Sequence, residues 1–365
     1  MWRVGRSRSL AEESSDPPSP TPRLSVIVPA RNEARNIGRC VQSILASTYP
    51  EFELIVVDDH SADGTSDVAR GASSGDPRFH ILANPPLPDG WFGKQWACAT
   101  GAAAASGELL LFTDADTWHA PELAVRAVNA LQRSRAALLS VAGSQETHSF
   151  WERLLQPQIL WMLLARYGGT DAVSHARRAE DVIANGQFML FTREAYDAIG
   201  GHASVRDKVA EDLALGQRVF RGDRRVVLVR GEDELSTHMY ASLDELLRGW
   251  GKNVYAGGID AMPGGRVGRL LFPIVLPLVP LMNLVPVLAL GAALLGLLGA
   301  GWLAWSLICV AASLLWWTLI YRGFRQRLWY ALLYPVGAAV VLYIFIGAIA
   351  RGRRVGWKGR QYVAR

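Results

Sequence analysis

Short apolar runs alternate with helical patterns along residues 24–262. The runs are rich in β-branched residues and leucine, have the length of buried strands, and end at polar or turn-forming residues. Strands are predicted at 24–28, 52–57, 79–82, 108–112, 136–142 and 224–229, with one more inside 184–202. Helices are predicted at 33–46, 64–70, 94–106, 120–133, 209–223 and 243–257. Strands that alternate with helices predict an α/β domain on a largely parallel sheet with right-handed crossovers.

The C-terminal third is apolar enough to enter a membrane. Residues 272–321 and 328–350 contain no charged side chain. A 50-residue helix would measure about 75 Å, more than twice the ~30 Å hydrocarbon core. The first block therefore must fold back, and Gly299–Gly301 is the predicted turn, whereas the second block fits one span. An amphipathic stretch at 149–168 is either a packed core helix or one that lies against the bilayer.

These patterns divide the chain into four parts. Residues 1–22 are rich in Ser, Pro and Glu and are predicted to be a disordered tail without a secretory signal. The predicted catalytic domain covers 23–262, the membrane region 263–350 and a basic tail 351–365. With no signal before the first strand, we expect a multi-pass protein of the inner (plasma) membrane with a cytoplasmic catalytic domain.

The number of spans conflicts with the charge of the tail. Two spans in 272–321 return the chain to the cytosol at Arg322, but one further span would put the basic tail outside, against the positive-inside rule. We favour a cytosolic tail, which requires one segment to be re-entrant or interfacial. The proline-rich start of the first block and the segment around Tyr334–Gly337 are the two candidates.

Composition narrows the partners. The net charge of +5 comes with basic clusters that border the apolar segments, which favours anionic headgroups over nucleic acid. The three cysteines are scattered, show no metal-binding spacing and suit a reducing compartment.

Acidic residues follow two of the predicted strands. Asp114 and Asp116 come directly after the run 108–112, and a second cluster, VVDDHSADGT at 56–65, closes the run 52–57. In open α/β sheets, ligands bind beyond the carboxyl ends of the strands. Two carboxylates with no basic neighbour in the sequence repel each other unless a cation lies between them. Mg²⁺ or Mn²⁺ is the expected ion, and such ions commonly arrive with a diphosphate, so the pattern indicates an enzyme acting on a nucleotide-activated substrate.

The order of motifs resembles the family 2 glycosyltransferases. Matching elements cover about 24–255 and are VIVPARNEARNI, VVDDHSADGT, GWFGKQWA, the DAD of 114–116, ANGQFMLFTREAYDAIGGH, AEDLALG and RGWGKN. The resemblance implies a GT-A fold, inversion at the anomeric carbon and dependence on a divalent metal. Within the family, GWFGKQWA, FTDADTWH and the tail WKGRQY are most similar to membrane-anchored enzymes associated with hopanoid and carotenoid pathways.

The resemblance also implies how the donor is held. Asp59 would accept hydrogen bonds from the base or ribose, with support from Asp58 or Asp63, although Asp and Gly here also suit a simple turn. Glu33 would contact the base, and Lys94 would reach the nucleotide or its phosphates; an ordinary exposed lysine is the alternative. The resemblance favours uridine as the base, with guanosine as the alternative.

Metal, base and acceptor roles follow in the same way. Asp116 would bind the cation, Asp114 would assist it or hold the ribose, and His238 would be a further metal or phosphate contact, unless it is only structural. Asp212, the second acid of the ED pair, is the candidate general base, whereas helix N-terminal carboxylates are the alternative explanation of that pair.

Arg248 and Trp250 match the Q-x-x-R-W element of processive synthases only partly, because Gly249 separates them and the Gln is missing. Arg248 is a diphosphate contact or, equally well, a residue that faces headgroups.

The leading hypothesis is transfer of a sugar from a nucleotide-sugar to a lipid acceptor, such as a polyprenoid, hopanoid or carotenoid, at the cytoplasmic face of the membrane. The alternatives are a processive polysaccharide synthase and a non-catalytic membrane scaffold. The weak match at Arg248 and the small number of spans count against the synthase, and the intact carboxylates count against the scaffold.

Overall fold

The computed structural model describes residues 8–240, 242–262, 265–352, 354–357 and 360–363. The chain divides into two compact units. Unit 1 consists of 1–146, 167–239 and 356–365, and unit 2 consists of 147–166 and 240–355. Unit 1 therefore contains most of the predicted catalytic domain together with the end of the C-terminal tail, and unit 2 contains the apolar segments.

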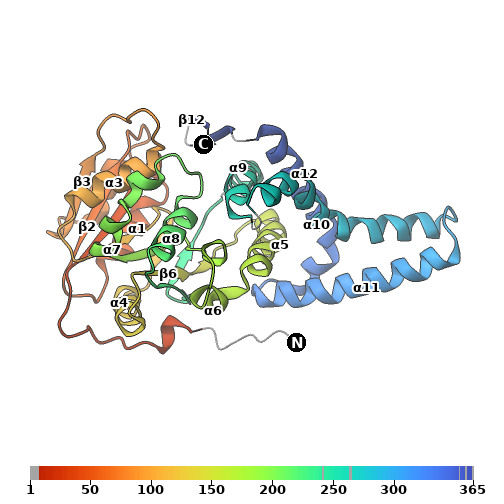
Figure 1. The fold of residues 1–365 in the computed structure, drawn as a ribbon, viewed down its shortest axis with the longest axis horizontal. Helices are drawn as coiled ribbons and strands as arrows, with labels where there is room; N and C mark the ends of the chain where they lie inside the picture. Colours follow the sequence, from red (N-terminus) through yellow and green to blue (C-terminus); the bar gives the residue numbers. More distant parts are fainter. Residues whose placement is uncertain (1–7, 241, 263–264, 353, 358–359, 364–365) are drawn as a thin grey trace. The chain divides into compact units, whose positions relative to one another are not determined.

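A mixed but mostly parallel sheet forms the centre of unit 1 (Figure 1). Its strand order is β3-β2-β1-β4-β8-β6-β9, where β8 runs antiparallel to both of its neighbours. The strands are β1 (Leu24–Ala30), β2 (Phe52–Asp58), β3 (Phe79–Ala83), β4 (Leu109–Phe112), β6 (Leu138–Ala142), β8 (Met189–Thr192) and β9 (Val226–Arg230). This arrangement confirms the predicted α/β fold class.

Side chains that alternate along the strands bury both faces of this sheet. Val26 and Val28 of β1 pack on one face, whereas Ile27 packs on the other. The first face is covered by α1 (Ile37–Leu45), α2 (Thr65–Ser73) and α4 (Leu123–Ser134), and the second by α3 (Gly93–Ala104), α7 (Arg193–Ala198) and α8 (Glu211–Arg221). Because both faces are buried, the strands are continuous apolar runs, which is why the sequence predicts them well.

A second sheet of three very short strands was not predicted. It has the order β5-β10-β7, built from β5 (Thr117–His119), β7 (Ser144–Gln145) and β10 (Leu235–Thr237). Thr237 pairs with Thr117 across β10 and β5, which run antiparallel. The sheet therefore joins the segment after β4 to a segment more than 100 residues later.

Both ends of the chain differ from the expectation. From Arg8 onward the N-terminal segment packs on unit 1, with Leu10 fully buried and the carbonyl of Arg8 accepting a hydrogen bond from the Arg230 amide, so residues 8–22 are not a disordered tail. Residues 1–7 lie outside the described part. The catalytic unit ends at Met239 rather than at 262, because the helix α9 (Leu243–Ala261) belongs to unit 2.

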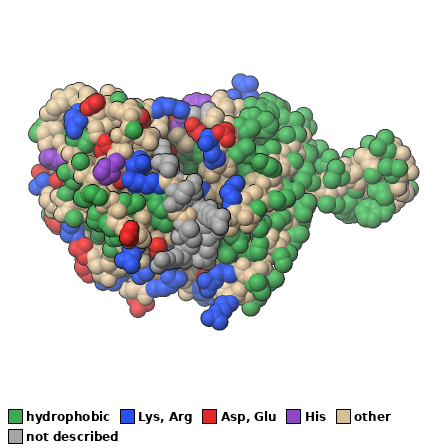
Figure 2. All heavy atoms as spheres, turned by 90° about the horizontal axis from the view of Figure 1, so that it is seen from above, with side chains coloured by type: hydrophobic (Ala, Val, Ile, Leu, Met, Phe, Trp, Pro, Cys, Tyr) green, Lys and Arg blue, Asp and Glu red, His purple; other side chains and the backbone are tan. Residues whose placement is uncertain are grey.

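Three helices of unit 2 are long and apolar enough to cross a membrane. They are α10 (Gly265–Leu294), α11 (Ala300–Gly323), and the segment Leu328–Arg351, which contains η4 (Leu328–Leu333) and α12 (Tyr334–Arg351). The helices α10 and α11 form a hairpin whose turn lies at 295–299, beside the predicted Gly299–Gly301 (Figure 1). Figure 2 shows hydrophobic side chains gathered over these helices. The amphipathic stretch forms α5 (Phe150–Tyr167), most of which belongs to unit 2.

Gly101 is the position where α3 approaches the sheet most closely. A Cβ atom there would lie 2.5 Å from Cγ2 of Ile27 and 3.1 Å from Cγ2 of Val57. We expect Gly101→Ala to lower the free energy of unfolding by about 1–3 kcal/mol, because overpacking outweighs the gain in helix propensity. Gly71→Ala in α2 is the matched control, since nothing lies within 4 Å of its Cβ. Denaturant unfolding in detergent micelles measures both, and equal effects of the two substitutions would contradict this packing.

Candidate active site

The acidic clusters lie at one edge of the main sheet. Strands β2, β1 and β4 are parallel neighbours, so their carboxyl ends share that edge. Asp59 follows β2 directly, Asp114 and Asp116 follow β4, and the amide of Asp59 donates a hydrogen bond at 2.8 Å to the carbonyl of Ala30 at the end of β1. This is the edge at which open α/β sheets bind ligands.

Asp59 is a buried carboxylate held by a dense set of donors. Its side chain is 1% exposed. Oδ1 accepts a hydrogen bond from Nδ2 of Asn84 at 3.0 Å, and Oδ2 accepts one from Nη1 of Arg360 at 2.5 Å. Arg31 donates to the main-chain carbonyl of Asp59 and lies 4.0 Å from Oδ2. The predicted nucleotide acid is therefore fixed in place by groups from three distant segments.

Asp58 and Asp63 shape the loop that follows β2. Asp58 accepts hydrogen bonds from the Ser61 amide at 2.9 Å and from the hydroxyl of Ser66. Asp63 accepts from the amides of Ala34 and Thr65 and from the Thr65 hydroxyl. Both carboxylates are engaged by their own surroundings, which favours a positioning role over the predicted contact with the nucleotide.

Glu33 lies at the start of the neighbouring loop. Its amide donates to Oγ1 of Thr65 at 2.8 Å, and Oε2 accepts from the side chain of Asn36 at 3.0 Å. The Glu33 carboxylate is also close enough to raise the pKa of Asp116. Glu33 thus belongs to this cluster, and its contact with a nucleotide base stays a prediction.

Lys94 connects two carboxylates at the centre of the site. Its Nζ lies 2.7 Å from Oδ1 of Asp114 and 2.7 Å from Oε1 of Glu211. Burial acts to lower the pKa of Lys94, but the charges of Asp114 and Glu211 outweigh it and raise this pKa well above its ordinary value. The acid pair after β4 therefore has a basic neighbour in space, which the local sequence does not show. The bond to Asp114 also makes Lys94 something other than an ordinary exposed lysine.

Asp116 has the properties of a cation ligand. Its Oδ1 is buried and has no hydrogen-bond partner in the described part of the chain. Burial, and then the charges of Asp114 and Glu33, raise the pKa of Asp116 well above its ordinary value. Ionisation of the Asp116 carboxyl group is therefore unfavourable, and a bound cation would stabilise the ionised form.

His238 lies beside Asp116 in the small sheet. The amide of His238 is 3.4 Å from the carbonyl oxygen of Asp116, one residue beyond the Thr237–Thr117 pair. Among the described residues, no three His, Cys, Asp or Glu side chains converge closely enough to hold an ion by themselves. The donor set thus fits Mg²⁺ or Mn²⁺ only when other oxygen ligands, such as those of a diphosphate, complete the coordination.

Asp212 is placed at the first turn of α8 by a glycine. Its Oδ2 accepts a hydrogen bond from the amide of Gly186 at 3.0 Å, and Oδ1 accepts one from the Leu213 amide at 2.7 Å. A Cβ at Gly186 would lie 3.1 Å from Oδ2, so a side chain there would press on the Asp212 carboxylate. Burial, and then the charge of Glu211, raise the pKa of Asp212 to about 6. A carboxylate with this pKa suits proton abstraction near neutral pH.

Arg248 belongs to a different unit from these acids. It belongs to α9 of unit 2, is exposed, and forms an ion pair with Asp244 one turn earlier in the same helix. Its predicted contact with a diphosphate stays a prediction.

Four residues of the site were not predicted from the sequence. Glu211 was passed over in favour of its neighbour, and Asn84 is a single amide after β3. Gly186 lies within a matched motif but was given no role. Arg360 lies in the WKGRQY tail, where the motif was noticed for its resemblance and not for chemistry. Gly186 directly precedes Gln187, and a Gly-Gln pair gives no signal of its own.

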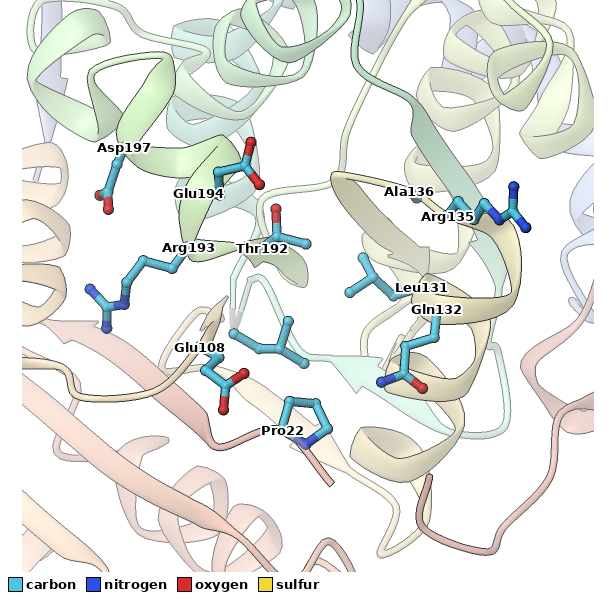
Figure 3. Close-up of a pocket in the computed structure, with 11 residues that line it drawn as sticks. Pro22, Glu108, Leu131, Gln132, Arg135, Ala136, Thr192, Arg193, Glu194 and Asp197 are labelled. Atoms are coloured by element: carbon cyan, nitrogen blue, oxygen red, sulfur yellow. The ribbon is translucent and has the colours of Figure 1, made fainter. Parts of the chain in front are cut away.

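A separate cavity of about 720 Å³ lies at the opposite edge of the main sheet (Figure 3). Its lining includes Leu109 at the start of β4 and Thr192 at the end of the antiparallel β8. Glu108, Arg193, Glu194 and Asp197 also line it. The cavity is remote from the carboxyl ends of the parallel strands and does not contain the predicted site residues.

Comparison with known proteins now identifies the family. Residues 25–200, which include Asp59, Lys94, Asp114 and Asp116, match the model of glycosyl transferase family 2. Residues 25–200 thus form a glycosyl transferase family 2 domain. This family 2 domain contains every element of the main sheet except β9.

Curated relatives are similar in sequence to most of this chain. It is 30% identical over 257 residues to a 4,4'-diaponeurosporenoate glycosyltransferase of Staphylococcus aureus (strain MRSA252), covering 69% of this chain and 65% of the relative. It is 25% identical over 246 residues to the enzyme of the same name from Staphylococcus haemolyticus, covering 67% and 64%. The chain thus spans slightly less than two thirds of the length of these relatives.

A solved structure supports the fold over nearly the full length of the chain. The mannosyltransferase PcManGT from Pyrobaculum calidifontis, in complex with GDP-Man and Mn²⁺, matches with a TM-score of 0.58 and 21% identity. The match covers 96% of this chain and 90% of the mannosyltransferase. The GT-A fold expected from the sequence is therefore confirmed.

The raised pKa of Asp212 makes a prediction about stability. A carboxyl group whose pKa is raised by folding destabilises the folded state above that pKa, and this penalty vanishes below the unfolded value near 3.8. We expect Asp212→Asn to raise the free energy of unfolding at pH 8 by about 1–3 kcal/mol, with the gain fading between about pH 6 and pH 4.

Denaturant unfolding at both pH values measures this effect. Asp67→Asn is the control, because its side chain is 88% exposed and the same substitution should change stability by less than about 0.5 kcal/mol at either pH. A loss of stability at pH 8 in Asp212→Asn would show that the carboxylate is not under this electrostatic penalty.

Proposed function

We propose that the protein transfers a sugar from a nucleotide-sugar to a carotenoid-like lipid acceptor at a membrane surface, with inversion at the anomeric carbon. The observation that carries this proposal is the joining of Asp114 and Glu211 by Lys94 at the carboxyl edge of the sheet. That contact brings the acids after β4 together with the ED pair of α8. The residues proposed to hold the cation, bind the donor and act as the base thus all belong to one unit.

The proposed roles follow from the surroundings of each acid. Asp59 would accept hydrogen bonds from the nucleoside, and Asp116 would hold Mg²⁺ or Mn²⁺. When bound, the cation supplies Lewis-acid stabilisation of the charge on the departing nucleoside diphosphate. Lys94 orients Asp114 and Glu211, and its charge keeps Glu211 ionised. Asp212 would take the proton of the acceptor hydroxyl as its oxygen attacks C1 from the face opposite the leaving group.

The choice of donor and acceptor is supported by similarity. The solved mannosyltransferase contains GDP-Man and Mn²⁺, which supports a nucleotide-sugar and a divalent cation here. The relatives are named for 4,4'-diaponeurosporenoate, which supports a carotenoid-like acceptor. The apolar helices of unit 2 suit an enzyme whose acceptor resides in lipid. We retain UDP-sugars as the first donors to test and GDP-sugars as the second.

A transfer assay on membranes tests the whole proposal. Membranes that contain the protein are incubated with radiolabelled UDP-glucose or GDP-mannose, Mn²⁺ and extracted lipids, and the organic phase is analysed by mass spectrometry. The proposal predicts a labelled glycolipid that carries a single sugar and disappears with chelator. A ladder of longer products would favour a synthase, and no product with any donor would favour a scaffold.

Asp212→Asn should abolish turnover while sparing donor binding. We expect the rate to fall by about 10²–10⁴-fold, because the proton acceptor is lost, whereas UDP affinity with Mn²⁺ changes only a few-fold in isothermal titration. For the wild type, kcat/KM should decline below about pH 6 as Asp212 becomes protonated. Asp67→Asn again serves as the control.

Two outcomes would contradict the base assignment. Loss of UDP binding in Asp212→Asn would place this residue in the donor site instead. Undiminished turnover would indicate an acceptor that is already an anion and needs no base.

The path of the chain also bears on topology. The chain leaves unit 1 at Met239 and returns to it at Gly356, so the intervening segment begins and ends at the same unit. An even number of crossings would keep unit 1 on one side of the membrane, although three helices are long enough to cross. In the segment Leu328–Arg351, 39% of the most apolar stretch is buried within the protein. The corresponding share is 17% for α10 and 11% for α11. We therefore propose that α10 and α11 cross the bilayer, that α12 lies at the interface, and that unit 1 is cytoplasmic.

Labelling of single cysteines tests this topology in a Cys309→Ser background, since Cys40 and Cys98 are buried. Leu297→Cys, in the exposed turn between α10 and α11, should react with an impermeant maleimide in intact cells. Arg327→Cys and Gly356→Cys should react only after permeabilisation. Labelling of Gly356→Cys in intact cells would show that three helices cross.

A further inference from the structure

The last described strand of the chain lies against the donor side of the family 2 domain. The strand β12 (Arg360–Val363) pairs with β11 (Arg354–Trp357). The Tyr362 ring lies 4.3 Å from the Phe92 ring, measured between centroids, and its hydroxyl accepts a hydrogen bond from the Gly93 amide at 3.2 Å. Two motifs more than 250 residues apart, GWFGKQWA and WKGRQY, thus meet in the fold.

Arg360 makes the second contact of this strand. Its Nη1 lies 2.5 Å from Oδ2 of Asp59, and its Nη2 lies 3.4 Å from Oδ1. The guanidinium is only 21% exposed and the carboxylate 1%. An arginine that donates through two nitrogens to a buried carboxylate makes a specific contact. An ion pair on the surface, in contrast, contributes little to stability.

The two contacts lie at the two ends of the expected donor site. Asp59 marks the nucleoside end in the proposed function. Gly93 is the first residue of α3 and precedes Lys94, which bonds Asp114 at the expected phosphate end. The strand β12 therefore extends along the same path that a nucleoside diphosphate would follow between these acids.

Charge shows what Arg360 can contribute there. Lys94 is already engaged with two carboxylates, and Arg31 donates to the main-chain carbonyls of Asp59 and His60. The Asp59 carboxylate lies near the guanidinium groups of both Arg31 and Arg360. A guanidinium has five N–H donors, so the two oxygens of Asp59 do not saturate it, and an anion with several oxygens fits the remainder.

We propose that Arg360 is a donor-binding residue and that β12 forms one wall of the nucleotide-sugar site. Arg360 holds the Asp59 carboxylate in the orientation that the nucleoside meets and offers its remaining N–H donors to the bound nucleotide. Tyr362 anchors the strand on Phe92 at the start of α3. This inference builds on the proposed function, because it assigns a residue to the same donor site.

Isothermal titration of the full-length protein in nanodiscs, with UDP or GDP in the presence of Mn²⁺, tests the assignment. Arg360→Gln should weaken binding of the preferred nucleoside diphosphate by about tenfold or more, as expected for a lost charge-assisted contact. Arg360→Lys keeps the positive charge but loses the paired N–H donors of the guanidinium. Its affinity should therefore lie between those of Arg360→Gln and the wild type. Arg70→Gln is the matched control, since it breaks an Arg–Asp pair on the exposed surface of α2 and should leave affinity unchanged.

Trypsin digestion supplies a second measurement that needs no substitution. If β12 is a wall of the site, UDP with Mn²⁺ should slow cleavage within 351–365, followed by mass spectrometry. Faster cleavage in the presence of UDP, or tighter binding by Arg360→Gln, would mean that the strand competes with the donor and would overturn the proposal.

The same titrations separate the two levels of inference. If the wild type binds neither UDP nor GDP, the proposed function fails and Arg360 loses its ligand. If the wild type binds one of them and Arg360→Gln binds it equally well, the donor site stands and only the role of Arg360 is wrong. An unchanged unfolding midpoint in Arg360→Gln shows that weaker binding does not come from misfolding.

Discussion

The repulsion between buried carboxylates is the constraint around which the catalytic unit is organised. Asp114 raises the pKa of Asp116 and Glu211 raises the pKa of Asp212, in surroundings where an unpaired charge is costly. Lys94 offsets part of this cost by contacting one acid from each pair. The rest remains with Asp116 and Asp212, and these are the two acids to which the proposed chemistry assigns a cation and a proton. The electrostatic cost of ionising Asp116 and Asp212, which folding does not offset, is thus the property on which their proposed roles depend.

The main sheet makes this concentration of charge possible. Strands β1, β2 and β4 are buried on both faces, so their carboxyl ends are fixed relative to one another by tight packing. That same burial is why the strands and the acids after them could be predicted from the sequence. A continuous apolar run followed by Asp is a local signal, and the parallel arrangement turns two such signals into one site. The fold class, the helical hairpin at 272–321 and the grouping of the acids therefore followed from local patterns.

What the sequence did not predict depends on pairs of residues that are distant along the chain. Strands of two or three residues, such as β7 and β10, have no periodicity to detect, yet β10 places His238 beside Asp116. Lys94 and Glu211 are ordinary helix residues until the fold brings them within 2.7 Å. Leu10 is a single apolar residue in a polar segment, and its burial shows in the structure alone. The same holds for Arg360, whose partner lies 301 positions earlier.

The neighbouring acids of α8 show how one position in a fold can give two chemistries. Glu211 and Asp212 are adjacent and both largely shielded from water, so burial raises the pKa of each. For Glu211 the Lys94 ammonium outweighs burial, and its pKa falls below the ordinary value. Asp212 has amide donors instead of a cation and has the Glu211 charge beside it, so its pKa rises to about 6. When the environments of two neighbouring carboxylates move their pKa values apart, one can serve a structural role and the other can transfer a proton. The order of the ED pair matters because α8 directs one side chain to Lys94 and the other to the Gly186 amide.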